Sequence, residues 1–277
     1  MIELLDSEKS SGMQSVERAV AVLDVVANNA DEGCRLADVV RDTDLGRATA
    51  HRFLRALEQL GLIELEERSG RYFPGSRLAA LGASAGNRFG LVRRAQPSLK
   101  RLASRTSDTV YLNLRVGDEA LCIAREEGAF PIKTLTVKAG DRRPLGVGAG
   151  PLALLSFLPA DEMQRQLETA AAKITAFGLD TATIYEMVEI SRACGYALND
   201  GRVIPGMGAV GVPITTKDGY PIAAISVAAI SSRLEPARRA NIVAWIREEV
   251  ARIEAELAPL LGPMAAGSLN ALLGSGG

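Results

Sequence analysis

The sequence is poor in the residues that build metal centres and nucleophilic active sites. It contains one histidine, His51, and three widely spaced cysteines, Cys34, Cys122 and Cys194. An odd number of cysteines without paired spacing predicts no disulfide framework. A single histidine also leaves the paired ligand spacing of a zinc site incomplete. We therefore expect no catalytic residues, no metal site and no cofactor.

Long hydrophobic runs are missing as well. The longest charge-free stretch before the C-terminal tail, residues 144–160, is interrupted by three prolines and three glycines, whereas a membrane-spanning helix needs ~20 mostly apolar residues. The N-terminal segment carries acids where a signal peptide has a basic start. With 277 residues, 47% of them apolar, and a mean hydropathy of +0.10, we expect a cytoplasmic protein of about two domains that does not engage a membrane.

Acidic residues are absent from one segment although the chain as a whole has a net charge of −1. Between residues 68 and 107 there is no Asp or Glu, and the nine basic residues are Arg68, Arg71, Arg77, Arg88, Arg93, Arg94, Lys100, Arg101 and Arg105. A basic segment in an otherwise acidic chain favours contact with a polyanion. The alternative is a solvated helix face that is basic without binding anything.

Three helices and a hairpin are predicted in the first 75 residues. Apolar residues at three-four spacing over 16–27 predict a first helix, residues 36–40 a shorter second one, and residues 47–60 a third that ends before a C′ glycine, Gly61. Two strand-like runs, 62–66 and 71–74, flank a Ser-Gly turn. This order is typical of a winged helix-turn-helix, whose third helix enters the major groove of DNA.

The third helix carries basic and hydroxyl side chains outside its apolar stripe. Arginine binds guanine edges and phosphates, and threonine binds phosphates or the thymine methyl group. Together with the basic residues of the hairpin, the candidate DNA-binding residues are Arg47, Thr49, His51, Arg52, Arg55, Arg68 and Arg71. The alternative for His51 is a helix-surface residue without a partner.

The pattern changes after residue 107. Residues 109–114 and 121–124 predict a strand hairpin, 133–137 a further strand, and 210–214 with 222–228 a later pair. Helices are predicted over residues 91–105, 159–172 and 181–194, and a last one after Pro236 carries apolar residues as far as Leu257. Helices beside a mainly antiparallel sheet make an α+β domain.

These segments resemble the IclR-type family of bacterial transcriptional regulators. The stretches SVERAVAVLDVVA and LADVVRDTDLGRATAHRFLRALEQLGLIE are similar to the DNA-binding half of that family, and Thr49, His51, Arg52 and Leu54 match the core of its recognition helix. The stretches RRPLGVGAGPLALLSFLP, RACGYALNDGRVIPGMGAVGVPI and AAISVAAISSRL are similar to its effector-binding domain. The resemblance covers about residues 13–258.

The resemblance implies an α+β chain in which an N-terminal winged helix-turn-helix is joined by a linker helix to a GAF-like or profilin-like effector-binding domain. We expect the winged helix-turn-helix over residues 12–75 and the linker helix over 76–92. The effector-binding domain is expected over 93–260 and a flexible tail over 261–277.

A glycine-rich turn at residues 146–151 precedes an apolar run that can begin a helix. Backbone N–H groups at a helix N-terminus favour an anion, although glycines also serve tight turns for steric reasons alone. The resemblance adds further positions, and the effector-binding candidates are Gly148, Ala149, Gly150, Asp200, Ala209, Ser226 and Ala228. Some family members carry cysteine and serine where this chain has Ala209 and Ala228, which favours a bulkier or aromatic organic acid here.

We therefore expect a ligand-responsive regulator that binds double-stranded operator DNA and a small organic acid. A homodimer is expected because one recognition helix buries too little surface for tight binding, and the resemblance implies a further step to a tetramer. One alternative is a small-molecule-binding enzyme with a helical accessory domain, which would need a nucleophile with a base or paired carboxylates. The other is a ligand-binding module that no longer binds DNA.

Overall fold

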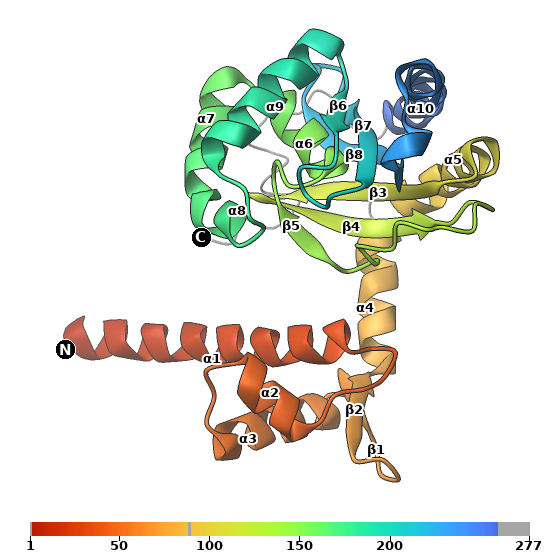
Figure 1. Cartoon of the computed structure of the whole chain (residues 1–277). Coiled ribbons are helices and arrows are strands. Elements are labelled where there is room, and N and C mark those ends of the chain that lie inside the picture. The colour runs from red at the N-terminus through yellow and green to blue at the C-terminus, as the bar shows by residue number, and fades with distance from the viewer. Residues whose placement is uncertain (1, 88–89, 260–277) are drawn as a thin grey trace. The chain divides into compact units, whose positions relative to one another are not determined.

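The computed structural model describes residues 2–87 and 90–259, and it describes side chains from residue 12 onward, except for 82–89 (Figure 1). The chain divides into two compact units, residues 1–88 and 89–277. The expected tail over 261–277, and residues 88 and 89 of the expected linker, lie outside the described residues.

The first unit has the expected order of three helices, a hairpin and a further helix. Its elements are α1 (Ile2–Asn28), α2 (Leu36–Asp42), α3 (Arg47–Gln59), β1 (Ile63–Glu66), β2 (Arg71–Pro74) and α4 (Ser76–Asn87). The first helix is longer than the predicted 16–27, because α1 begins at Ile2 and includes residues 2–15 as well. No proline interrupts that segment, so nothing in its backbone prevents the helix from continuing.

The core of this unit forms where the apolar stripes of α1 and α3 meet the hairpin. Its fully buried side chains include Val22, Val26, Val39, Leu54 and Ile63. Gly61 has a positive φ of 69° and ends α3 as predicted, with N–H groups of Gly61 and Leu62 donating to the carbonyls of Glu58 and Leu57. Leu60 and Leu81 lie outside this core, since their side chains are 52% and 53% exposed.

The second unit contains one sheet of six antiparallel strands in the order β5-β4-β3-β8-β7-β6. Its strands are β3 (Thr109–Val116), β4 (Glu119–Glu126), β5 (Arg142–Pro144), β6 (Ala197–Asn199), β7 (Met207–Thr215) and β8 (Pro221–Ile230). Its helices are α5 (Leu91–Thr106), α6 (Ala149–Ser156), α7 (Ala160–Thr169), α8 (Ala171–Thr175), α9 (Thr181–Cys194) and α10 (Pro236–Leu257), with a 3-10 turn at Ser231–Arg233. The mixed α+β class is confirmed.

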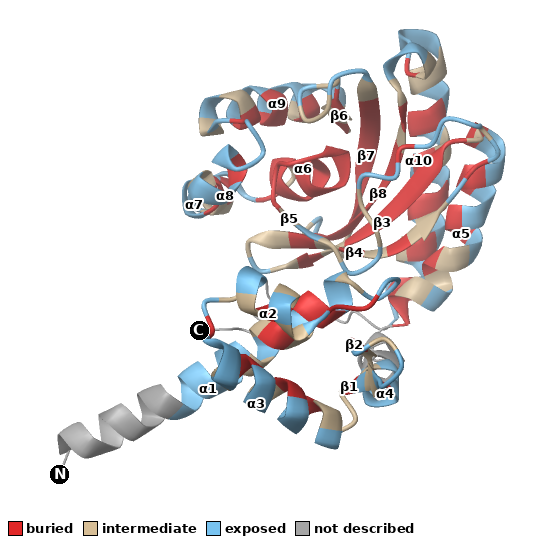
Figure 2. Cartoon of the chain, turned by 60° about the horizontal axis from the view of Figure 1, so that its bottom comes forward, coloured by how far each residue is buried: buried red, intermediate tan, exposed pale blue. Residues whose placement is uncertain are grey.

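Helices cover both faces of the sheet (Figure 2). On one face, α5 and α10 pack their apolar stripes against β3, β7 and β8. On the other, α6 lies against the sheet and α9 packs against α6. Every described residue of α6 is buried, which explains why this short helix has no polar side beyond Ser156.

The strand predicted over residues 133–137 is wrong. The edge of β4 pairs with β5 instead, with Glu119 opposite Pro144 and Leu121 opposite Arg142. Residues 127–141 form an irregular loop between β4 and β5, which we call the strap. Its carbonyls accept hydrogen bonds from side chains: Arg143 donates to Thr136 over 2.9 Å and Arg125 donates to Val137 over 3.1 Å.

The basic segment predicted to contact a polyanion has a different role in its second half. Three arginines of α5 pair with acids of α10: Arg101 with Glu249 at 2.6 Å, Arg105 with Glu248 at 2.8 Å, and Arg94 with Glu256 at 3.6 Å. These charges hold two helices of the second unit together. The polyanion interpretation therefore does not apply to these three residues.

Candidate functional site

The third helix presents most of its predicted DNA-binding residues to solvent. Arg47, His51, Arg52 and Arg55 are exposed on α3, and Thr49 is half-buried. Buried positions on the opposite side, Ala50, Leu54 and Leu57, fix this orientation by packing into the core. Arg55 also reaches Glu58 over 3.4 Å, one turn along the same helix.

The two remaining DNA-binding candidates, Arg68 and Arg71, lie on the hairpin but differ in their contacts. Arg68 is exposed in the turn between β1 and β2. Arg71 instead donates from Nη1 to the carbonyls of Gly33 and Glu32, over 2.7 and 3.2 Å. Its guanidinium thereby holds the loop between α1 and α2 against the hairpin, beside the backbone bridge that joins Cys34 and Tyr72.

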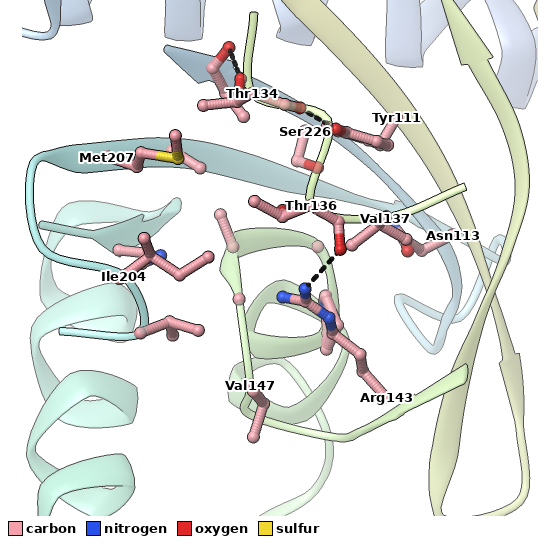
Figure 3. A pocket seen from close by; sticks show the side chains of 18 of the residues that line it. Tyr111, Asn113, Thr134, Thr136, Val137, Arg143, Val147, Ile204, Met207 and Ser226 are labelled. Atoms are coloured by element: carbon pink, nitrogen blue, oxygen red, sulfur yellow. Dashed lines mark hydrogen bonds between the residues drawn. The ribbon is translucent and has the colours of Figure 1, made fainter. Parts of the chain in front are cut away.

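The second unit contains a cavity of about 60 Å³ between the sheet, the N-terminus of α6 and the strap (Figure 3). One ordered water needs ~10–15 Å³ of such space, so the cavity has room for several water-sized groups. Six of the seven predicted effector-binding residues line it: Gly148, Ala149, Gly150, Ala209, Ser226 and Ala228.

Asp200, the seventh, does not line the cavity. Its side chain is 53% exposed and lies 3.4 Å from Arg202. The preceding residue, Asn199, is 8% exposed and lines the cavity. Neighbouring residues of a strand face opposite sides, and β6 places Asn199 opposite Ala209 of β7 on the inner side.

Two close backbone approaches place the start of α6 in the cavity. Gly148 is the N-cap with a φ of 100°, a conformation that favours glycine. A Cβ atom on Gly150 would collide with the side-chain amide of Asn113, and one on Gly211 would collide with the carbonyl of Ala149. The first N–H groups of a helix have no partner within the helix, and those of α6 belong to residues that line the cavity.

Arg143 is a functional candidate that sequence reasoning missed. It lies on β5 and lines the cavity, and Figure 3 shows its guanidinium directed toward the middle of the pocket. Burial lowers the pKa of this guanidinium, although Tyr111 and Asp141 act in the opposite direction. Arginine stays protonated in proteins. Among the described residues, no carboxylate forms an ion pair with it, although Asp141 also lines the cavity and offsets part of its charge.

The strap closes one side of the cavity through Thr134. Its carbonyl accepts a hydrogen bond from the hydroxyl of Tyr111, and its own hydroxyl donates to the carbonyl of Ala228 over 2.9 Å. Burial raises the pKa of Tyr111 to about 12. Both contacts attach the strap to β3 and β8, the central strands of the sheet.

Comparison with known families decides the identity. The model described as the IclR helix-turn-helix domain matches residues 15–67, and the model described as the bacterial transcriptional regulator IclR C-terminal domain matches residues 83–255. The chain belongs to the IclR family. As a family member it is a DNA-binding transcriptional regulator, and the enzyme alternative is set aside because the curated relatives are regulators.

Individual IclR-type relatives agree over nearly their whole length. The regulator BhcR of Paracoccus denitrificans is 29% identical over 258 residues, covering 92% of this chain and 91% of its own. The regulator XynR of Escherichia coli is 28% identical over 254 residues, covering 90% and 98%.

Two solved structures share the IclR fold. The IclR transcriptional regulator of Alicyclobacillus acidocaldarius has a TM-score of 0.74 at 23% identity, covering 87% of this chain and 98% of its own. An IclR homologue of Microbacterium hydrocarbonoxydans, solved in complex with 4-hydroxybenzoate, has a TM-score of 0.72 at 22% identity and covers 88% and 98%.

Two kinds of feature are absent from the described part of the chain. No helix there is both long and apolar enough to cross a membrane. No group of three or more His, Cys, Asp or Glu side chains there is arranged to hold a metal ion.

Proposed function

We propose that α3 enters the major groove of operator DNA and that the turn between β1 and β2 contacts the flanking phosphates. Arg47, Arg52 and Arg68 support this assignment because they are exposed and form no ion pair with a described acid. Thr49 and His51 complete the face of α3, where short polar side chains can reach base edges or phosphates.

Two further arginines take part less directly. The Arg55–Glu58 pair is exposed and long at 3.4 Å, so it contributes little to stability and can exchange for a phosphate contact. Arg71 supports the DNA-binding surface by holding the loop between α1 and α2.

The pocket of the second unit takes a small organic acid. The observation that carries this proposal is that the guanidinium of Arg143, which forms no ion pair with a described carboxylate, and the N-terminus of α6 line one cavity. Both favour a carboxylate, the first by charge and the second by its free N–H groups. The Microbacterium relative, which holds 4-hydroxybenzoate, gives a precedent for an aromatic acid in this fold.

The protein acts as a homodimer, with two dimers able to pair. A winged helix places one short recognition helix on the DNA, whereas specific complexes of dimeric proteins bind two half-sites about one helical turn apart. Sedimentation of the purified chain with and without DNA gives its mass directly. A monomer bound to operator DNA would contradict the dimer.

The proposed DNA binding is tested by fluorescence anisotropy on DNA upstream of the protein's own coding region, across a salt series. Arg52→Ala should weaken binding and reduce the salt slope by about one. Arg165→Ala is the matched control, because Arg165 is an exposed arginine on α7 in the second unit. Binding without sequence preference, with Arg52→Ala equal to the wild type, would favour a ligand-binding module that does not bind DNA.

The proposed acid site is tested on the same DNA complex with a panel of aromatic and aliphatic acids. One acid should change the DNA affinity, since a ligand shifts a two-state equilibrium by its differential affinity for the two states. Arg143→Met should abolish that response while leaving DNA binding without the acid intact. If no acid of the panel binds the wild type in calorimetry, the effector assignment is wrong, whereas the proposed DNA binding still stands.

A further inference from the structure

The end of α3 and the start of α4 supply each other's backbone hydrogen bonds. Three consecutive carbonyls follow the last residue of α3, and each accepts from the beginning of α4. Arg77 donates twice, from Nη1 to the carbonyl of Leu60 over 3.0 Å and from its N–H to that of Gly61 over 3.2 Å. The N–H of Gly75 donates to the carbonyl of Leu62 over 2.9 Å. The last carbonyls and first N–H groups of helices lack partners within the helix, and here the two ends meet.

Gly75 permits this approach because it has no side chain. It is buried, and a Cβ atom at this position would lie 2.4 Å from the carbonyl oxygen of Gly61 and 2.9 Å from the carbonyl carbon of Leu62. The two backbones therefore pack directly on each other. The next residue is held as well, since the N–H of Ser76 donates to a carboxylate oxygen of Glu64 on β1 over 3.1 Å. We call these contacts of residues 60–62 with residues 75–77 the α3–α4 joint.

The charge of Arg77 is directed to the end of a helix. Its guanidinium binds the C-terminus of α3, where the helix dipole places partial negative charge. Arg47 begins α3 at the other end, and a helix of 13 residues is about 20 Å long. Arg77 is exposed and belongs to the segment without acids, but its contact within the first unit is with the α3 backbone. This contact fixes where α3 ends relative to α4.

We propose that Arg77 and Gly75 are positioning residues for operator recognition. They fix the angle between α3 and α4, and with it the direction in which the exposed side chains of α3 point. Base contacts depend on that direction, whereas phosphate contacts carry no sequence information directly. Weakening the α3–α4 joint therefore reduces sequence-specific binding more than non-specific binding. A change in the direction of α4 is likewise passed to α3. The inference rests on the proposed placement of α3 in the major groove.

Fluorescence anisotropy of the full chain on two duplexes tests the role of Arg77. One duplex is the upstream DNA used above, and the other is a shuffled duplex of the same length and base composition. Arg77→Ala should lower the affinity for the upstream DNA about threefold to tenfold, the effect of one hydrogen bond. The affinity for shuffled DNA and the salt slope should not change. A direct phosphate contact would weaken both complexes and reduce the salt slope by about one, and that result would overturn the proposal.

Gly75→Ala tests the backbone contact without changing any charge. It should lower the affinity for the upstream DNA at least as much as Arg77→Ala does, again at an unchanged salt slope. Gly12→Ala is the matched control, because a Cβ atom on Gly12 would meet nothing within 4 Å. Urea unfolding shows whether Gly75→Ala folds, and if it does not, Arg77→Ala decides alone. Folded variants that bind both duplexes as the wild type does would overturn the proposal.

Arg52→Ala, measured beside these variants, separates the two possible failures. If Arg52→Ala weakens binding while the joint variants bind as the wild type does, α3 binds DNA and the positioning role is wrong. If Arg52→Ala also equals the wild type, the placement of α3 in the groove is wrong, and the positioning role fails with it.

Discussion

The carbonyl oxygen of Ala149 lies so close to Gly211 of β7 that a Cβ atom on Gly211 would come within 3.0 Å of it. This approach lets the N-terminus of α6 rest directly on the sheet. The position of the first α6 residues in the cavity depends on it, because any side chain at residue 211 would lift the helix.

Gly211→Ala should therefore weaken both the fold and the acid site. Forcing an extra carbon against the backbone of a packed core costs about 1–3 kcal/mol, measured as a lower free energy of unfolding in urea. Gly208→Ala is the comparison on the same strand, because its Cβ would meet the flexible end of Leu234 at 2.8 Å and would come no nearer than 3.3 Å to a backbone carbonyl, that of Asn199. An equal loss in both variants would show that the Ala149 carbonyl is not the obstacle.

The three cysteines should differ in reactivity. Burial raises the pKa of the Cys34 and Cys122 thiols to about 11, whereas Cys194 is exposed. Because the thiolate is the nucleophile, maleimide at pH 7.5 should label one thiol per folded chain and three after denaturation. Mass spectrometry gives the count. Native Cys194→Ser should remain unlabelled, and rapid labelling of Cys34 or Cys122 would contradict their burial.

Tyr111 should make stability fall at high pH. Its pKa is raised by burial from 10 to about 12, so the folded state keeps a proton that the unfolded state releases between these values. The stabilisation is complete below pH 10 and is lost as pH rises toward 12, by ~1–3 kcal/mol. Urea unfolding at pH 9 and pH 11 measures the loss. Tyr111→Phe should show a smaller decrease, and an identical decrease would assign it to other groups.

Substitution of Asp108 should lower the free energy of unfolding more than substitution of most other charged residues. Its carboxylate is 2% exposed and accepts from Arg233 and Arg238 over 2.8 and 2.7 Å. Removing one partner of a fully buried pair costs about 3–5 kcal/mol. Asp108→Asn should cost about 2–3 kcal/mol, because the arginines are 23% and 31% exposed. Urea unfolding measures it, with Asp161→Asn, from an exposed pair on α7, as a near-neutral control.

Much of the fold could be predicted because its main elements have regular apolar spacing. The stripes of α5 and α10 are buried at the positions the sequence indicates, from Leu91 to Leu102 and from Ile242 to Leu257. Strands β5 and β6 cannot be predicted from the sequence, because each has three residues, too few to show an alternating pattern. Residues 133–137 of the strap alternate as a strand does, but distant side chains bind the strap's carbonyls where a neighbouring strand would otherwise pair.

The site was predictable in part for a related reason. The glycine-rich turn pointed to the start of α6, but the choice between Asn199 and Asp200 depends on the pairing of β6 with β7. Sequence spacing cannot give that register. Arg143 carried one signal, a charge directly before a long uncharged run, and only the pairing of β5 with β4 shows that it lines the cavity.

The way the strap is held has a consequence for how this regulator can evolve. Its carbonyls at Thr134, Thr136 and Val137 are bound by side chains that belong to β3, β4 and β5. A carbonyl is present whichever residue occupies the position, so the side chains of Thr136 and Val137, which line the cavity, can be replaced without releasing the backbone of the strap. Gene duplicates could thus acquire new ligands through substitutions in the strap while the sheet stays unchanged.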